Sequence, residues 1–509
     1  MYYRHLIERT VRMHGDRVAV VYGETARTFA VVHERAKRLA NALAARGCRP
    51  GDRVAVLLHN CPEYLEIDIG LALAGYVRVS LNTRAPARQQ VDVVTDSGAK
   101  ALIYAERFAA AAGEILRTAD VPAVLRLEGD TTAREISDYD AALAAAPDTP
   151  PPGDAEPGTP YCLFYTSGTT GRPKGVMLTP SAYVAVAHNL LLEFGPVCAG
   201  DKIVLTQPLS HGGGFFLLPW FMSGATCVVM EKFDPAGCIE LTERHGAQTL
   251  KVVPTMLLQM LSAGVTASDL PALRKIIYGA SPMPATQLEE LIGTFGAVFA
   301  QLYGQAEAPM SITVLDERDH AAGGRLLSSA GRPWRGVEVR VVDADGRDVA
   351  PGEPGEVIVR GPHLMAGYWK QPEMTAEVLR DGYVHTRDMA ELDDRGYLYL
   401  LGRTDEMIIS GGFNIAPRVV EDVLNRHPAI LESAVIGLPH DTLGQQVAAF
   451  VSPRPGRDVS VEEIIAYTRA ELGYQRPRRV EVRASLPRNA YGKVSTPDLL
   501  AGLREVDTR

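Results

Sequence analysis

A loop rich in glycine and hydroxyl residues limits most strongly how this chain of 509 residues folds. The apolar, strand-like segment Tyr161–Tyr165 runs directly into Thr166–Gly175, which reads TSGTTGRPKG. Glycines let the backbone approach an anion, N–H groups and hydroxyls surround phosphate oxygens, and Lys174 adds a positive charge. The spacing is not that of a Walker A loop, because Lys174 follows a proline and precedes a glycine. We expect a phosphate site of another class, with a flexible surface loop as the alternative.

The segments around this loop alternate between strand-like and helix-like patterns. We expect strands over Arg53–Leu58 and Lys100–Tyr104, with a helix over Glu63–Leu73 between them. Such alternation is typical of parallel sheets covered by helices. Ile203–Met230 contains no Asp, Glu, Lys or Arg, but prolines and glycines interrupt it. We therefore expect a buried strand and helix there, and no membrane span.

The pattern changes after about residue 331. Two alternating segments, Val337–Val342 and Glu356–Arg360, flank the turn at Asp345-Gly346 and predict short antiparallel strands. The last hundred residues combine predicted strands at Glu432–Leu438 and Gln446–Ser452 with helices, one of them opened by the capping box Ser460–Glu463.

The fold class that these patterns predict is α/β. A large N-terminal domain, residues 1–403, holds parallel-type sheets covered by helices and a small antiparallel β-barrel-like region. A small C-terminal α+β domain follows over residues 404–509.

Charge and cysteine usage exclude several classes of protein. The net charge of -9 disfavours nucleic-acid binding, which needs a basic surface. None of the six cysteines forms a CxxC pair, so neither a zinc site nor a redox motif is indicated. The charged N-terminus lacks the apolar core of a signal peptide, and we expect a cytoplasmic protein.

The glycine-rich loop closely resembles the phosphate-binding signature of the adenylate-forming superfamily. That superfamily includes acyl-CoA ligases, nonribosomal adenylation domains and luciferases, and matching motifs continue in family order as far as Lys493. The resemblance implies a two-step reaction that uses ATP, Mg²⁺ and coenzyme A. A carboxylate attacks the α-phosphate to give acyl-AMP and pyrophosphate, and the thiol of coenzyme A then displaces AMP.

The resemblance also implies roles for residues of the large domain. Tyr303 corresponds to the residue that stacks on adenine, Glu307 to the carboxylate that holds magnesium, and Asp388 and Arg403 to the groups that contact the ribose. The same resemblance assigns Lys174 a catalytic role. The other nucleotide-binding positions that it implies are Thr166, Ser167, Gly168, Thr169, Thr170, Gly171, Gly279, Ala280, Ser281, Gly304 and Ala306.

Three further motifs imply that the C-terminal domain is a mobile lid that alternates between the two half-reactions. Asp405 matches the hinge. The loop Ser410–Asn414, with Gly411 and Gly412, resembles the one that lines the pantetheine tunnel. Lys493 matches the mobile lysine that steadies the carboxylate and the α-phosphate during adenylation.

The segment Pro208–Phe216 corresponds to part of the family's acyl pocket. An α-ammonium group would need a buried carboxylate, and none occurs nearby in the sequence, which disfavours amino-acid substrates. The glycines at 212–214 favour space for a bulky hydrophobic acid, although they also suit a simple bend of the backbone. His211 either gates this pocket or satisfies a hydrogen bond in the core.

Four positions depart from the family's pattern, namely Ala306, Arg387, Val419 and Thr496. The first two adjoin the adenylation chemistry. One hypothesis is therefore an enzyme that adenylates poorly and makes the thioester from a preformed acyl-AMP, supplied by a partner ligase; tolerated drift is the other.

Other functions remain open. The chain could load a carrier protein in trans, bind adenylate without catalysis, or act as a luciferase-like oxygenase. The sequence leaves the oligomeric state open, with a homodimer as one option.

Overall fold

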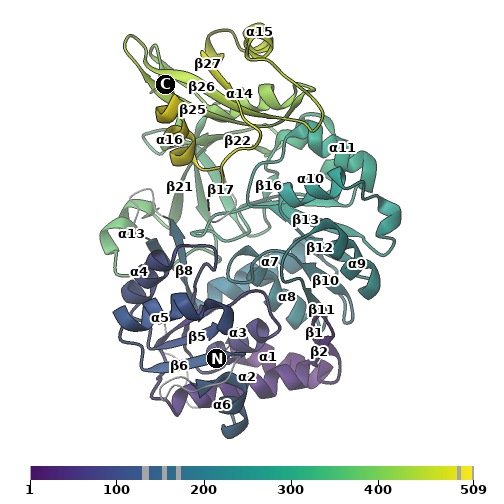
Figure 1. Cartoon of the computed structure of the whole chain (residues 1–509), viewed down its shortest axis with the longest axis vertical. Helices are drawn as coiled ribbons and strands as arrows, with labels where there is room; N and C mark the ends of the chain where they lie inside the picture. Colours follow the sequence, from purple (N-terminus) through teal and green to yellow (C-terminus); the bar gives the residue numbers. More distant parts are fainter. Residues whose placement is uncertain (1, 129–136, 152–157, 168–172, 490–493, 507–509) are drawn as a thin grey trace.

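We describe a computed structural model of the chain, which covers residues 2–128, 137–151, 158–167, 173–489 and 494–506. Two large sheets with their helices fill the lower part of the molecule in Figure 1, and the C-terminal sheet lies at the top. The predicted α/β class with parallel-type sheets is confirmed.

The first large sheet has eight strands in the order β19-β9-β8-β4-β3-β5-β6-β7. Its strands are β3 (Arg53–Leu57), β4 (Val77–Ser80), β5 (Ala101–Ala105), β6 (Ala123–Leu127), β7 (Ser137–Asp138), β8 (Cys162–Ser167), β9 (Pro173–Leu178) and β19 (Gly367–Tyr368). The helices along this part of the chain are α1 (Tyr2–His14), α2 (Phe29–Ala44), α3 (Glu63–Leu73), α4 (Ala87–Ser97), α5 (Ala109–Thr118) and α6 (Tyr139–Ala145). Apart from the antiparallel pairs β8–β9 and β9–β19, the strands run parallel. The predicted strand at Arg53 and helix at Glu63 are confirmed.

The second large sheet has nine strands in the order β16-β15-β14-β13-β12-β10-β11-β1-β2. Its strands are β1 (Val18–Tyr22), β2 (Thr25–Thr28), β10 (Lys202–Leu205), β11 (Thr226–Val229), β12 (Thr249–Lys251), β13 (Lys275–Gly279), β14 (Phe299–Tyr303), β15 (Thr313–Leu315) and β16 (Arg332–Pro333). The helices along it are α7 (Pro180–Phe194), α8 (Leu217–Met222), α9 (Pro235–His245), α10 (Pro254–Ser262), α11 (Ala285–Phe295) and α12 (Glu317–Ala322), with the 3-10 turn η2 (Gly212–Phe216). The charge-free segment forms β10, η2, α8 and β11, and its apolar side chains are largely buried, as expected.

The main core unites both large sheets. One cluster of buried residues includes Val54 and Ile103 from the first sheet and Ile203 and Ile277 from the second. The opposite face of each sheet has a cluster of its own. Burial on both faces explains why the parallel strands read as continuous apolar runs.

A third sheet is antiparallel and has five strands. It comprises β17 (Glu338–Val342), β18 (Gly355–Arg360), β20 (Leu379–Arg380), β21 (Tyr383–Leu392) and β22 (Leu398–Arg403), with α13 (Pro372–Val378) beside it. The strands predicted on either side of Asp345-Gly346 pair from Glu338↔Arg360 to Val342↔Glu356, which confirms the hairpin.

The fourth sheet belongs to the C-terminal unit, by which we mean the described residues from 408 to 506. It contains β23 (Ile408–Ser410), β24 (Phe413–Ile415), β25 (Ile430–His440), β26 (Gly444–Pro453) and β27 (Arg479–Val482), with α14 (Pro417–Asn425), α15 (Val461–Leu472) and α16 (Thr496–Val506). The hydroxyl of Ser460 accepts the N–H of Glu463 at the start of α15, which is one of the two hydrogen bonds of the predicted capping box.

The C-terminal unit has its own core and contacts α11 of the large domain through hydrogen bonds. Its two buried clusters draw every member from the unit itself. On α11, Thr286 and Gln287 donate hydrogen bonds to the main-chain carbonyls of Asn425 and Leu431. The domain boundary at residues 403/404 remains a prediction.

Candidate active site

The hairpin of β8 and β9 carries the two ends of the glycine-rich loop. Thr166 pairs with Lys174 and Ser167 with Pro173 in an antiparallel register, so the loop emerges from one end of the first sheet. The ammonium group of Lys174 lies 6.0 Å from the ring centre of Tyr368. Four predicted phosphate contacts, Gly168, Thr169, Thr170 and Gly171, lie outside the described residues.

Asp388 lies at the centre of the predicted nucleotide site, and two of the predicted side chains contact its carboxylate. Its carboxylate accepts hydrogen bonds from the Tyr303 hydroxyl and, at 2.6 Å, from the Gln305 amide. The Arg403 guanidinium lies 3.4 Å from the other carboxylate oxygen, and strand pairing places Arg403 directly opposite Asp388. Burial and the adjacent carboxylate raise the pKa of Tyr303, so its hydroxyl stays protonated and donates. The structure thus brings together three residues predicted to contact the nucleotide.

The segment after β14 is held tightly against its own chain. A side chain at Gly304 would meet the Met310 nitrogen at 2.6 Å and the Ala308 carbonyl at 2.9 Å, so only glycine fits this turn. Gln305 reaches across to the third sheet, where its amide also donates to the Thr386 carbonyl at 3.1 Å. Ala306 packs against the main core.

Glu307 is placed by a tyrosine of the first sheet. The hydroxyl of Tyr368 on β19 donates to the Glu307 carboxylate at 2.6 Å, and the Met365 N–H donates to the Glu307 carbonyl at 2.9 Å. Burial and the neighbouring carboxylate raise the pKa of Tyr368. Magnesium in nucleotide sites takes one or two carboxylates together with phosphate oxygens and water, so a single oriented carboxylate fits its needs.

Gly279, Ala280 and Ser281 follow directly from β13. Gly279 is buried, and a Cβ there would lie 2.4 Å from the carbonyl of Leu302 on the next strand. Ala280 adopts a positive φ of 75°, and it is exposed. The backbone therefore turns sharply away from the sheet at the edge where Tyr303 also ends its strand.

Arg387 occupies a backbone position that favours glycine. Its φ is 60°, in the left-handed region that L residues seldom adopt. The side chain is half exposed and lies 3.6 Å from Glu377 on α13. The carbonyl of Arg387 accepts a hydrogen bond from the Thr404 hydroxyl at 3.0 Å, which ties this position to the predicted hinge.

The predicted hinge, Asp405, lies just before the C-terminal unit, and the loop predicted to line the pantetheine tunnel, Ser410–Asn414, lies near the start of that unit. Asp405 is exposed and accepts a hydrogen bond from Arg403 at 3.2 Å. Gly411 and Gly412 have φ of 59° and 83° and form the two-residue turn between β23 and β24, as such hairpins require. The predicted mobile lysine, Lys493, lies outside the described residues.

His211 lies between the two large sheets. Its ring stands edge-on to Phe164 at 5.4 Å, and its Nδ1 lies 2.8 Å from the Ser210 hydroxyl. Burial, with Arg84 and Arg78 nearby, lowers its pKa to about 4, so the ring is neutral at pH 7.

The glycines beside His211 have a packing role. A Cβ at Gly213 would meet the Gln207 carbonyl at 2.7 Å, and one at Gly214 would meet the Leu209 carbonyl at 2.2 Å. The hydroxyl of Tyr183 also donates to the Gly214 carbonyl at 3.0 Å. Close approach of the backbone thus accounts for these two glycines. This agrees with the second interpretation of the sequence, in which the glycines serve a bend of the backbone.

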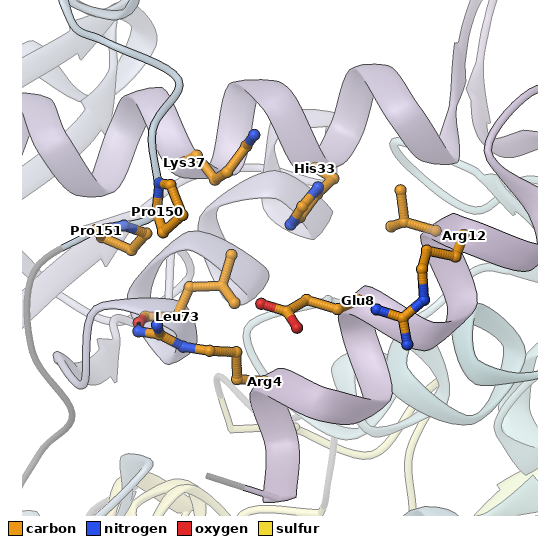
Figure 2. Close-up of a pocket in the computed structure, with 9 residues that line it drawn as sticks. Arg4, Glu8, Arg12, His33, Lys37, Leu73, Pro150 and Pro151 are labelled. Carbon is orange, nitrogen blue, oxygen red and sulfur yellow. Dashed lines mark hydrogen bonds between the residues drawn. The ribbon is translucent and has the colours of Figure 1, made fainter.

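A pocket of about 220 Å³ lies elsewhere, between α1, α2 and Pro150–Pro151 (Figure 2). Its polar lining residues are Arg4, Glu8, Arg12, His33 and Lys37. None of the predicted site residues lines it. A second, much smaller pocket is bordered by Ser80, Tyr165 and His211.

Sequence reasoning missed several residues that build the site. Tyr368 and Gln305 position Glu307 and Asp388, and Tyr183 fixes the turn at Gly214. Gln305 lay within a recognised motif, whereas Tyr183 sits in an apolar helix and carries no local signal.

Metal clusters and membrane-spanning helices are both absent from the part of the chain that the structure covers. No group of three or more His, Cys, Asp or Glu side chains there is arranged to hold a metal ion. No helix in the same ranges is both long and apolar enough to cross a bilayer.

Comparison with known proteins gives consistent matches along the chain. Residues 7–369 match the model of the AMP-binding enzyme family, and residues 419–493 match that of the AMP-binding enzyme C-terminal domain. Feruloyl-CoA synthase from Amycolatopsis sp. is 38% identical over 96% of both chains. The fatty acid–[acyl-carrier-protein] ligase ScoC from Streptomyces coeruleorubidus is 35% identical over 93% of this chain and 91% of its own. The solved o-succinylbenzoate CoA synthetase MenE from Bacillus subtilis, in complex with the acyl-adenylate OSB-AMP, is 30% identical over 97% of both chains, with a TM-score of 0.85.

Proposed function

Since this chain belongs to the AMP-binding enzyme family, we propose that it activates a bulky, hydrophobic, non-amino carboxylic acid as acyl-AMP and transfers it to coenzyme A. It is an acid–thiol ligase of the kind that its CoA-ligase relatives represent. The observation that carries the proposal is the convergence of Tyr303, Gln305 and Arg403 on Asp388, where the end of β14 meets β21 and β22 of the third sheet.

This arrangement suits the binding of a nucleoside. A carboxylate held by three donors keeps a fixed orientation and accepts hydrogen bonds from the two ribose hydroxyls. Tyr303 offers an aromatic face for adenine, and the loop after Gly279 closes the edge of the ring.

The charged groups beside the nucleotide have complementary roles in the first step. Lys174 would neutralise phosphate charge, and Glu307, oriented by Tyr368, would hold Mg²⁺, which would supply positive charge beside the phosphate oxygens. Lys493 steadies the attacking carboxylate and the α-phosphate. After pyrophosphate leaves, rotation about Asp405 brings Gly411 and Gly412 to the site, where coenzyme A attacks the acyl-adenylate.

The lining around His211 supports a hydrophobic, non-amino acid. Phe164 and Phe215 stand 5.9 Å apart beside the neutral imidazole. The segment Ile203–Met230, which includes His211 and Phe215, contains no Asp or Glu, so it offers no carboxylate to an α-ammonium group.

A paired assay tests the proposal. One arm supplies the acid, ATP, Mg²⁺ and coenzyme A, and the other supplies synthetic acyl-AMP with coenzyme A. Thioester in both arms is expected; no thioester in either arm, over a panel of aryl and alkyl acids, would contradict it.

A second candidate is an enzyme impaired in adenylation, and the observation behind it is Ala306 beside Glu307. The lost hydroxyl removes one contact near the phosphates. Thioester in the acyl-AMP arm alone would favour this candidate, and restored pyrophosphate release in Ala306→Thr would locate the defect. A partner ligase would then supply the adenylate.

A third candidate is transfer to a carrier protein in trans, which the likeness to ScoC supports. Replacing coenzyme A by a holo-carrier protein in the first arm distinguishes the acceptors. We also propose a cytoplasmic location, which the six free cysteines support. Whether the enzyme is a homodimer is a question for light scattering.

A further inference from the structure

A buried lysine interrupts an apolar row on the second large sheet. Lys251 ends β12 and is 1% exposed. Its register places it beside Leu205 and Ile277 on the adjacent parallel strands. The same row continues with Val229 and Ala300, and all four of these neighbours belong to the main apolar core.

The ammonium group has little to compensate its charge. Nζ donates to the main-chain carbonyl of Val252 at 3.1 Å and lies 5.4 Å from the ring centre of Phe216. Among the residues that the structure describes, no carboxylate forms an ion pair with it. Burial alone lowers its pKa to about 7. An uncompensated cation in such surroundings destabilises a protein, so its presence needs a reason.

The position of Lys251 links it to the acyl pocket. Its neighbour Ile277 lies two residues before Gly279 on the same face of β13, which is about 7 Å at the usual rise of a strand. Phe216, which covers the ammonium group, ends the segment Pro208–Phe216 that we expect to line the pocket. Lys251 therefore lies beside the strand that leads to the loop Gly279–Ser281, and its ammonium group lies near Phe216 of the expected acyl pocket.

We propose that Lys251 determines substrate specificity by binding a second anionic oxygen group, at the end of the acid opposite the reacting carboxylate. This inference rests on the proposed function and narrows its substrate class to acids with a hydrophobic middle and an anionic far end. Such a ligand supplies the counter-charge that the protein lacks, and Phe216 and Ile277 contact the apolar middle.

Matched pairs of acids test this inference on the full-length enzyme. We suggest straight-chain monocarboxylic acids against dicarboxylic acids of equal carbon number, and 3-phenylpropanoate against its para-carboxylated analogue. KM and kcat are measured for wild type, Lys251→Met, Lys251→Arg and the control Leu205→Met, which places the same side chain on the next strand.

The expected result is selective. Wild type uses the diacid of at least one pair with a KM about 10- to 100-fold lower than its monoacid, a range typical of charge-assisted bonds. Lys251→Met removes that preference, Lys251→Arg retains part of it, and Leu205→Met leaves it in place. A preference for monoacids in wild type, or an equal loss for both acids in Lys251→Met, would overturn the inference while leaving the ligase activity established. Failure to form any thioester would instead refute the proposed function.

If Lys251→Met fails to fold, the pH dependence of the wild-type enzyme provides a second test of the proposal. Neither the strand partners of Lys251, Leu205 and Ile277, nor Phe216 near its ammonium group carries a titratable side chain. The ratio of diacid KM to monoacid KM should rise as pH increases above about 7, because the lysine loses its charge. A ratio constant from pH 6 to 9 would contradict the proposal.

Discussion

The nucleotide half of the candidate site, around Asp388 and Glu307, and the acyl half, around Lys251, differ in how their charged side chains are paired. In the nucleotide half, Asp388 has three partners and Glu307 has a tyrosine donor. In the acyl half, Lys251 has one main-chain carbonyl and an aromatic ring. The nucleotide half is organised before any ligand arrives, whereas the acyl half holds a charge whose partner the protein does not supply. The first arrangement suits a cosubstrate common to the whole family, and the second suits the part of the substrate that varies among its members.

The largest effect should come from dismantling the nucleotide half. Asp388→Ala leaves Tyr303, Gln305 and Arg403 without their shared acceptor, and the loss of this acceptor from a partly buried network costs about 1–3 kcal/mol. Pyrophosphate release should fall by about 10²- to 10³-fold. Asp348→Ala, which breaks an exposed ion pair with Arg340 near the same sheet, is the control. Wild-type rates in Asp388→Ala would show that the nucleotide binds elsewhere.

The opposite change in the acyl half should stabilise the fold. Lys251→Met removes an uncompensated cation, and we expect the free energy of unfolding to rise by about 1–4 kcal/mol below pH 7. The folded-state pKa of about 7 lies below the usual 10.5, so the unfolded chain binds the extra proton between these values. Wild-type stability therefore increases with pH across that window, and the advantage of the variant shrinks. Urea unfolding at pH 6 and pH 9 measures both effects; a variant less stable than wild type at pH 6 would contradict the prediction.

A smaller effect is expected where one neutral donor is lost from the nucleotide half. Tyr368→Phe removes the 2.6 Å hydrogen bond to Glu307 and should lower the adenylation rate about tenfold. The Mg²⁺ concentration for half-maximal rate should rise, because the carboxylate loses its orientation. Tyr383→Phe is a matched control, since that hydroxyl donates to the exposed Glu338 at 2.5 Å. If Tyr368→Phe needs the same Mg²⁺ concentration as wild type, Glu307 does not hold the metal.

The smallest effect should follow from Arg387→Gly. Glycine adopts the φ of 60° without strain, and the arginine side chain contributes only a half-exposed ion pair. We expect the free energy of unfolding to change by no more than about 1 kcal/mol and pyrophosphate release by less than about threefold. A large gain in adenylation would instead identify Arg387 as the residue that impairs the first step.

The sequence predicted the parts of the fold that depend on local patterns. The helix at Glu63, the hairpin around Asp345-Gly346 and the buried segment from Ile203 all follow from periodicity and turn residues over a few positions. The motif that contains Tyr303 and Glu307 was likewise visible, because its residues are adjacent.

Contacts between distant segments were beyond such reasoning. Gln305 and Asp388 are 83 residues apart and meet only because the chain leaving β14 of the second sheet passes beside β21 of the third. Lys251 closes a three-residue strand, where a lysine usually extends its ammonium group to solvent, so nothing in TLKVV marks it as buried. In the sequence, Gly213 and Gly214 suggested open space for a substrate. In the structure, main-chain carbonyls pack directly against both glycines and fill that space.

The contacts between the C-terminal unit and α11 have a consequence for how the two parts of the gene can evolve. Both of its buried clusters consist of residues of the unit itself, and two of its anchors are the main-chain carbonyls of Asn425 and Leu431. Any amino acid supplies a carbonyl, so substitutions at these two positions leave those hydrogen bonds available. The two parts of the gene are therefore free to accumulate changes at different rates, and recombination between related genes near codon 404 should yield chimaeras that fold.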